Sequence, residues 1–187
     1  MGCLMQVRPL DIAGAALLET ERRGDARGSF ARWFCDRELG KVLAGSAIHQ
    51  INHSFSARAG TVRGLHFQHA PHAEKKIVRC LAGKVYDVLL DLRQGSPTFL
   101  QWRGVELSAE NDLALLIPEG CAHGFQTLSD DVELLYLHTA HYTPQAEAGV
   151  AHDDPRILLA WPLAVTELSE RDRSHPRLAD DFAGITL

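Results

Sequence analysis

Short apolar runs of strand length, each followed by turn residues, are the feature that most constrains how this chain can fold. They occupy residues 76–81, 85–92, 113–117 and 132–136, with turn sequences such as Ala82-Gly83 and Pro118-Glu-Gly120 between them. Short strands separated by Gly, Pro and Asp at regular spacing are typical of a β-sandwich or a β-barrel. The sequence therefore predicts an all-β fold.

Helical patterns are weak and short. Residues 36–44 could form one short helix, and residues 169–172 a single helical turn with Ser169 as its N-cap, since a serine oxygen accepts a hydrogen bond from an amide of the first turn. We expect one domain over residues 1–187. It would have an N-terminal arm with strands to about residue 50, a barrel from about 50 to 150, and a tail from about 151 to 187 folded over the barrel.

Composition limits the class of partner. The net charge is −5 and the pI is near 6.0, which argues against nucleic acid or an anionic membrane surface, because binding to phosphate backbones needs clustered Lys and Arg. A small phosphorylated ligand needs only a few cations in one pocket. No apolar run approaches the roughly 18 residues of a membrane helix, no signal peptide is evident, and the four cysteines lack CxxC spacing. We expect a cytoplasmic protein with reduced thiols.

The densest polar segment is Gly60-Thr-Val-Arg63-Gly-Leu-His66-Phe-Gln68. On a regular strand Arg63 and Leu65 would face one way and His66 and Gln68 the other, unless a bulge intervenes. A histidine buried in an apolar barrel stays neutral and basic near pH 7, because burial lowers its pKa. His66 is therefore a candidate general base; the alternative is a core histidine bonded to a backbone carbonyl.

Two further side chains could carry chemistry. His123 lies between small residues in Gly120-Cys-Ala-His123-Gly124, where another group could approach closely; the alternative is a glycine-rich hairpin with an incidental histidine. Tyr136 ends an apolar strand and could present its hydroxyl to a cavity as a general acid. Its alternative is core packing with a satisfied hydroxyl. No dinucleotide loop, phosphate loop or nucleophile elbow is present in the sequence.

Several motifs follow in order between about residue 25 and residue 177. They include Asp25-Ala-Arg27-Gly28-Ser-Phe30, Gln50-Ile-Asn52-His53-Ser54, Arg63-Gly-Leu-His66-Phe-Gln68, Lys76-Ile-Val-Arg79, Asp87-Val-Leu-Leu-Asp91-Leu-Arg93, Pro118-Glu-Gly-Cys-Ala-His123-Gly-Phe125 and Leu168-Ser-Glu-Arg-Asp172. Each is weak alone, but in this order and spacing the chain resembles the dTDP-4-dehydrorhamnose 3,5-epimerase family of the cupin superfamily. The resemblance implies a cupin-like jelly-roll β-barrel and a homodimer with exchanged N-terminal strands.

The resemblance also implies an activity without a cofactor. The expected reaction inverts C3, C5 or both of a nucleotide-linked 4-keto-6-deoxy sugar, with dTDP as the expected nucleotide, in rhamnose-type deoxysugar biosynthesis. By resemblance His66 removes the proton next to the ketone and Asp172 orients and charge-balances it, as the third group does in a catalytic triad. Lys76 would stabilise the enolate oxygen, and Tyr136 would return a proton from the opposite face.

A further set of polar side chains matches the family's substrate contacts: Arg27, Gln50, Asn52, Arg63, His123, Tyr142, Glu147 and Arg171. Arg27 and Arg63 correspond to diphosphate contacts, where a guanidinium fork suits phosphate oxygens. Tyr142 corresponds to an aromatic residue that stacks on the nucleobase, and Asp87 is expected to support His123.

Four positions depart from the family pattern. Arg32 stands in the segment after Phe30 where Glu-Ser-Phe is usual, Ile51 replaces an aspartate, Leu137 a lysine and His141 a tyrosine. The proton-transfer residues are intact while these peripheral ones differ. The pattern suggests the same chemistry on a related sugar, or epimerisation at only one carbon.

Two alternatives come from other functional classes. The first is a sugar-nucleotide binding protein without turnover, although binding alone does not need a base and an acid. The second is a metal-dependent cupin oxygenase or isomerase, since His66, His69 and His72 lie three apart. Metal-binding cupins, however, typically present His-x-His on one strand, and Gln68 stands at the second position. We therefore expect no metal.

Overall fold

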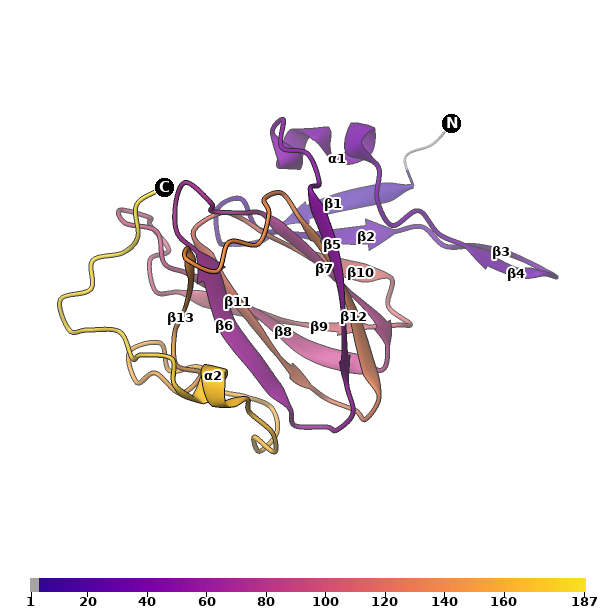
Figure 1. Ribbon diagram of the computed structural model, residues 1–187. Helices are drawn as coiled ribbons and strands as arrows, with labels where there is room; N and C mark the ends of the chain where they lie inside the picture. The colour runs from indigo at the N-terminus through magenta and orange to yellow at the C-terminus, as the bar shows by residue number, and fades with distance from the viewer. Residues whose placement is uncertain (1–3) are drawn as a thin grey trace.

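Two antiparallel sheets face each other in the computed structural model, which describes residues 4–187 and so leaves Cys3 outside. The six-stranded sheet has the order β1-β2-β10-β7-β12-β5 and the five-stranded sheet the order β13-β6-β11-β8-β9 (Figure 1). The strands are β1 (Met5–Pro9), β2 (Ala16–Thr20), β3 (Arg23–Asp25), β4 (Gly28–Phe30), β5 (Gln50–Ser56), β6 (Val62–Gln68), β7 (Lys76–Ala82), β8 (Lys84–Asp91), β9 (Trp102–Ser108), β10 (Leu113–Ile117), β11 (Cys121–Thr127), β12 (Val132–His138) and β13 (Glu147–Gly149). The expected all-β fold is confirmed.

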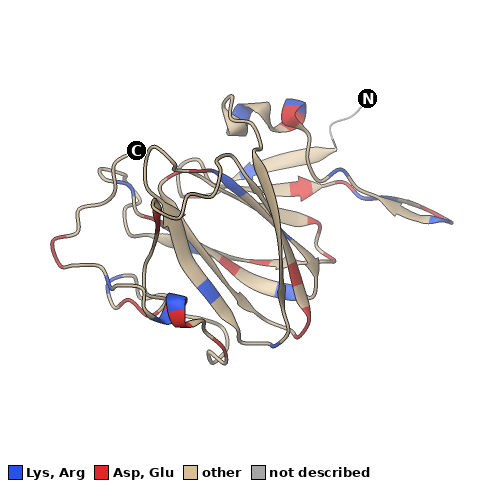
Figure 2. Ribbon diagram, in the orientation of Figure 1, with Lys and Arg blue, Asp and Glu red and all other residues tan. Residues whose placement is uncertain are grey.

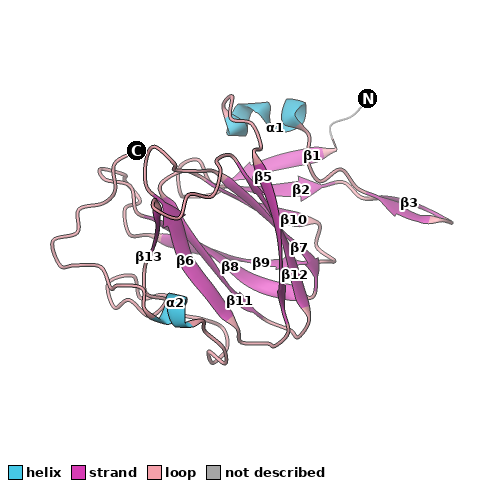
Figure 3. Cartoon of the chain, in the orientation of Figure 1, coloured by secondary structure: helices cyan, strands magenta, loops and turns pink. Residues whose placement is uncertain are grey.

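The two short helices lie where the sequence predicted them (Figure 3). They are α1 (Asp36–Leu43) and α2 (Glu170–Arg173). Ser169 caps α2 as expected, because its hydroxyl oxygen accepts a hydrogen bond from the Asp172 amide at 3.1 Å. Among the described residues, no helix is long and apolar enough to cross a membrane.

Apolar side chains from both sheets fill the space between them. Val78, Leu115 and Leu134 of the six-stranded sheet pack with Leu89 and Phe125 of the five-stranded sheet. These residues come from the alternating positions of strands whose other face turns away from the centre. The sandwich core therefore accounts for the apolar runs in the sequence.

The outer faces of both sheets are also covered. Leu39 and Leu43, four residues apart on α1, are buried with Leu18, Ile77 and Leu116 on the outer face of the six-stranded sheet, since residues at this spacing share one face of a helix. The C-terminal segment covers the outer face of the five-stranded sheet, through residues that include 157 and 185. Both sheets are held between two apolar layers.

A β-bulge in β6 interrupts the alternation of side chains that a regular strand would have. His123 of β11 pairs with His66, but Phe125 pairs with Arg63, so Gly124 lies opposite two residues of β6. A bulge of this kind redirects the side chains that flank it. Arg63 and His66 therefore line the same cavity, whereas a regular strand would have turned them to opposite faces.

Candidate active site

A cavity of about 690 Å³ opens between the two sheets. Every residue that the sequence analysis placed in the site lines it, apart from Arg27 and the supporting Asp87: Gln50, Asn52, Arg63, His66, Lys76, His123, Tyr136, Tyr142, Glu147, Arg171 and Asp172. They come from β5, β6, β7, β11, β12, β13, α2 and the segment after β12. Segments far apart in the chain thus contribute to one site.

The partly buried His66 forms a hydrogen-bonded pair with the buried Asp172. His66 Nε2 lies 2.8 Å from Asp172 Oδ1, and the other carboxylate oxygen accepts a hydrogen bond from the Gly64 amide at 3.1 Å. Burial opposes ionisation of Asp172, but the hydrogen bond and charge of His66, together with the Gly64 amide and the Arg171 charge, hold its pKa well below its ordinary value. The ionised Asp172 accepts a hydrogen bond from the Nε2–H of His66, which leaves Nδ1 as the basic nitrogen.

Tyr136 lies on the opposite wall, because it belongs to β12 of the six-stranded sheet whereas His66 belongs to β6 of the five-stranded sheet. Its hydroxyl is 2.9 Å from Ser54 Oγ. Burial raises the pKa of Tyr136 above its ordinary value, and the hydrogen bond with Ser54 offsets only part of this effect. The phenol is therefore protonated at neutral pH and can donate a proton.

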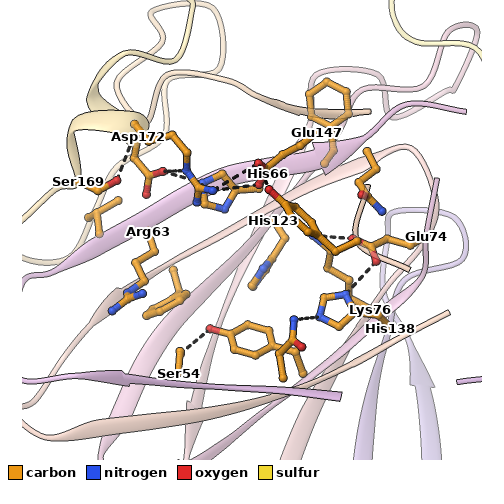
Figure 4. Close-up of a pocket in the computed structure, with 18 of the residues that line it drawn as sticks. Ser54, Arg63, His66, Glu74, Lys76, His123, His138, Glu147, Ser169 and Asp172 are labelled. Atoms are coloured by element: carbon orange, nitrogen blue, oxygen red, sulfur yellow. Dashed lines mark hydrogen bonds and ion pairs between the residues drawn. The ribbon is translucent and has the colours of Figure 1, made fainter. Parts of the chain in front are cut away.

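Lys76 is paired with a residue that the sequence analysis missed. Its Nζ lies 3.2 Å from Glu74 Oε1, and His138 Nδ1 lies 2.9 Å from Glu74 Oε2 (Figure 4). Glu74 and His138 both line the cavity. The period of two along β12 was a usable signal for His138, since it shares a face with Tyr136. No comparable signal marks Glu74, which precedes β7.

A second histidine–carboxylate pair is more deeply buried than the pair of His66 and Asp172. His123 Nε2 is 3.0 Å from each oxygen of Asp87, and both side chains are buried. The His123 ring also meets the ring of Tyr136 edge to face, with 6.2 Å between the centroids. Asp87 does not line the cavity itself, so its contact with His123 supports a residue that does.

Polar residues at the mouth of the cavity are connected through Tyr142, which is half exposed. Its hydroxyl donates to Glu147 Oε2 at 2.8 Å, and Arg171 Nη1 donates to the same carboxylate at 3.2 Å. The Tyr142 amide donates to Gln50 Oε1 at 3.0 Å, and Gln50 donates to Asn52 Oδ1 at 3.1 Å. Figure 2 shows acidic and basic residues together on α2, which carries Arg171.

Arg27 lies away from this cavity. It follows β3 in the β3–β4 hairpin, which projects from the sandwich (Figure 1). Its side chain is 89% exposed and forms an ion pair with Asp25 at 2.5 Å. Within one chain, Arg27 therefore cannot contact a ligand held between the sheets.

The four departures from the family pattern also lie outside the set of cavity-lining residues. Leu137 is buried beneath α1, and Arg32 is paired with Glu38 of that helix. Ile51 is 62% exposed on β5, and the ring of His141 lies 5.2 Å from that of His49. These four residues surround the site, and none of them contributes to its lining.

One group of described residues could offer three metal ligands: His66, Asp172 and His175, whose ligand atoms lie within 4.8 Å of one another. His69 and His72 do not belong to it. The guanidinium of Arg171 occupies the same neighbourhood, with Nη2 3.3 Å from His66 Nε2 and Nε 3.4 Å from Asp172 Oδ1. This donor set does not fit a resident metal, because a fixed positive charge already borders it.

Comparisons with known proteins point to the same family that the sequence motifs resemble. The family model described as dTDP-4-dehydrorhamnose 3,5-epimerase matches residues 9–180. The enzyme of that name from Sinorhizobium fredii is 44% identical over 177 residues, which cover 94% of this chain and 91% of that protein. A dTDP-4-dehydrorhamnose 3-epimerase from Streptomyces niveus is 40% identical, with 94% and 85% covered.

Among solved structures, the dTDP-4-dehydrorhamnose 3,5-epimerase of Bacillus anthracis, with TDP and PPi bound, superposes with a TM-score of 0.90. It is 41% identical to this chain, and the match covers 93% of this chain and 99% of that one. The expected cupin-like jelly-roll fold is confirmed. From the family model, the sequence identity and the shared fold, we conclude that this chain belongs to the dTDP-4-dehydrorhamnose 3,5-epimerase family.

Proposed function

We propose that this chain is a cofactor-independent epimerase that inverts C3, C5 or both of a dTDP-linked 4-keto-6-deoxy sugar in deoxysugar biosynthesis. The observation that carries the proposal is the placement of His66 on one sheet, bonded to the ionised Asp172 of α2, and of Tyr136 on the other sheet, around one cavity. Inversion of a carbon requires that a proton leave from one face and return to the other. A base and an acid on opposite walls meet this requirement.

In the first step, Nδ1 of His66 removes the proton next to the ketone, and the electrons move onto the ketone oxygen to form an enolate. Asp172 stabilises the imidazolium that results, since its carboxylate is already ionised. Lys76 places its ammonium at the same cavity, where positive charge stabilises the enolate oxygen.

In the second step, the Tyr136 hydroxyl delivers its proton to the opposite face of the same carbon, and the enolate returns to the ketone with inverted configuration. The tyrosinate then regains a proton and His66 loses one, through water. Because burial keeps Tyr136 protonated at neutral pH, the phenol still holds its proton when the enolate forms and can act as the acid.

The nucleotide end is assigned to the mouth of the cavity. Tyr142 offers an exposed aromatic face, and Gln50, Glu147 and Arg171 surround it with donors and acceptors. Arg63 lines the cavity and offers the fork geometry that binds diphosphate oxygens. The bound TDP and PPi in the Bacillus anthracis structure support this choice of ligand class.

We further propose a homodimer in which the β3–β4 hairpin reaches the partner's cavity. All six strand residues of this hairpin are exposed, including Phe30 at 62%. The edge strand β5 also presents two large apolar side chains to solvent, Ile51 at 62% and Phe55 at 50%. Exchange would cover this apolar surface and bring Arg27 to a diphosphate that it cannot reach within its own chain.

The test is incubation in deuterated water, with a chelator present, of the enzyme and a small panel of nucleotide-linked 4-keto-6-deoxy sugars. We expect deuterium at each inverted carbon of the dTDP-linked member, detected by proton NMR. The number of labelled and inverted carbons distinguishes a 3,5-epimerase from an enzyme acting at one carbon. Absence of both exchange and inversion for every member, or their loss only when metal is chelated, would refute the proposal.

A further inference from the structure

Lys76 forms an ion pair with Glu74 in the cavity wall. Its ammonium lies 3.2 Å from Glu74 Oε1, with the Lys76 side chain 11% exposed and the Glu74 side chain 7% exposed. A carboxylate so near would hold the ammonium in one place, since both charges have been withdrawn from most of their water. An ammonium has three donors, so two remain for other partners when one is bound to Glu74.

Glu74 is itself held by His138. The Asn52 amide nitrogen lies 3.4 Å from His138 Nε2, and an amide nitrogen can only donate. His138 Nε2 is therefore the acceptor, so Nδ1 carries the ring proton and donates it to Glu74 Oε2 at 2.9 Å. Each oxygen of Glu74 thus has a separate partner, His138 on one side and Lys76 on the other.

This chain of contacts continues to the mouth of the cavity. Asn52 accepts a hydrogen bond from Gln50, and Gln50 accepts one from the Tyr142 amide. The contacts run from Tyr142 at the mouth to Lys76 inside. Figure 4 shows Glu74, His138 and Lys76 gathered at one end of the cavity, away from Arg63 and Ser169.

Glu74 carries its charge in this position. Burial would raise the pKa of its carboxyl, but the hydrogen bond from His138 and the charge of Lys76 outweigh burial, so the pKa lies below its ordinary value. A buried carboxylate that is ionised and bonded at both oxygens is a rigid support for a neighbouring ammonium.

We propose that Glu74 is a positioning residue that fixes the ammonium of Lys76 where the enolate oxygen forms, and that His138 keeps Glu74 in place. The inference rests on the proposed role of Lys76 in the epimerase reaction. It predicts that Glu74 acts on the reaction through Lys76 and has little effect on ground-state binding of the substrate.

The kinetic test uses Glu74→Gln, which keeps the size of the side chain but has only one acceptor oxygen for two partners. We expect kcat to fall by up to about 100-fold, since misplacing a catalytic group by about 1 Å has an effect of this size. KM should stay within about twofold of wild type, because the lost interaction acts in the transition state. A loss confined to KM would overturn the proposal.

Glu133→Gln is the matched control. Glu133 also pairs with a histidine, His53, at 3.1 Å on the same sheet, but both side chains are about half exposed and Glu133 does not line the cavity. We expect kcat to be unchanged in this variant. Equal losses in Glu74→Gln and Glu133→Gln would show a general effect on the sheet and contradict the specific role.

A double-mutant cycle shows whether Glu74 acts through Lys76. In a Lys76→Met background, Glu74→Gln should lower the residual rate of deuterium exchange by less than about twofold, because residues that act as a unit are not additive. Full multiplication of the two losses would contradict the proposal. Glu74→Asp provides a second variant that keeps the charge, and we expect its kcat to lie between those of wild type and Glu74→Gln.

A measurement without substrate separates this inference from the proposed function. The rate at which an amine-reactive reagent acylates Lys76, followed by peptide mass spectrometry, should rise in Glu74→Gln and stay at the wild-type value in Glu133→Gln. If wild type shows no exchange with any sugar, the proposed function fails while this rate still tests the pair. An unchanged acylation rate in Glu74→Gln would overturn the positioning role.

Discussion

His66 and His69 lie three residues apart on the chain but differ in their surroundings. His66 lines the cavity and is bonded to Asp172, whereas His69 is exposed after the end of β6. We predict that His66→Ala lowers kcat by about 10²–10⁴-fold, the usual contribution of a positioned base, and that His69→Ala changes it little. Steady-state kinetics of both variants checks this, and comparable losses would refute the assignment of the base.

Variants of Tyr136 and His66 should show different phenotypes, because in the proposed mechanism Tyr136 acts only after the enolate has formed. Tyr136→Phe removes only the hydroxyl and its contact with Ser54. His66 can still remove the proton and return a solvent-derived one to the same face. In deuterated water the variant should exchange hydrogen for deuterium but yield little inverted sugar, whereas His66→Ala should lose both. Inversion at the wild-type rate in Tyr136→Phe would show that another group is the acid.

At the scale of the element, the bulge in β6 depends on a glycine. Gly64 has φ of +124°, and a Cβ there would lie 2.5 Å from Gly124 Cα and 2.7 Å from the His123 carbonyl oxygen. We predict that Gly64→Ala destabilises the fold by more than about 2 kcal/mol, since both backbone strain and a clash with backbone oppose it. Because Arg63 and His66 flank the bulge, activity should fall as well.

The control is Gly40→Ala in α1, where a Cβ would meet no atom within 4 Å. This change should stabilise the protein by about 0.5–1 kcal/mol, because alanine is the better helix former. Urea unfolding of the two variants measures both free energies. A Gly64→Ala protein as stable and active as wild type would mean that the bulge does not need glycine.

The hydrogen bonds of Asp91, at the end of β8, should make the stability of the protein depend on pH. Asp91 accepts hydrogen bonds from Arg93, Ser96 and Thr98; burial opposes its ionisation, but these bonds lower its pKa to about 2. Since the folded pKa lies below the unfolded value, Asp91 stabilises the protein above about pH 4, and this contribution is lost as pH falls toward 2. Asp91→Asn should lower the free energy of unfolding at pH 7 by about 2–3 kcal/mol.

The pH dependence of that difference is the decisive measurement. The gap between wild type and Asp91→Asn in unfolding free energy should narrow as pH is lowered from about 4 toward 2, because wild-type Asp91 then becomes protonated. A gap that stays constant over this range would mean that the charge of Asp91 does not contribute to stability.

At the scale of the whole molecule, an exchanged dimer predicts complementation between two inactive chains. Arg27→Ala should weaken substrate binding so far that little activity remains at low substrate concentration, and His66→Ala should nearly abolish turnover. In a mixed dimer, one cavity would combine an intact His66 with the partner's Arg27. Co-expression should therefore restore about a quarter of wild-type activity, since half of the dimers are mixed and each has one complete site. A fully active monomer by light scattering, or absence of complementation, would contradict the exchange.

The sequence by itself determined the class of fold and predicted many of the residues that line the candidate site. The strand runs, α1 and the Ser169 cap are local patterns, in which period and turn chemistry depend on neighbours along the chain. His66, Lys76, Tyr136 and Asp172 were predicted as catalytic residues from the family resemblance that motif order and spacing carry, and all four line one cavity. Patterns of this kind can be recognised without knowing which strands pair.

Only the tertiary structure decided which side chains face one another. The bulge that brings Arg63 beside His66 arises from the pairing of β6 with β11. The contact of Glu74 with His138 joins a segment before β7 to the end of β12. Strand register and bulges are set by pairing between distant segments, and a change of one residue in register turns a side chain to the other face of its sheet. Local patterns along the chain do not carry that information.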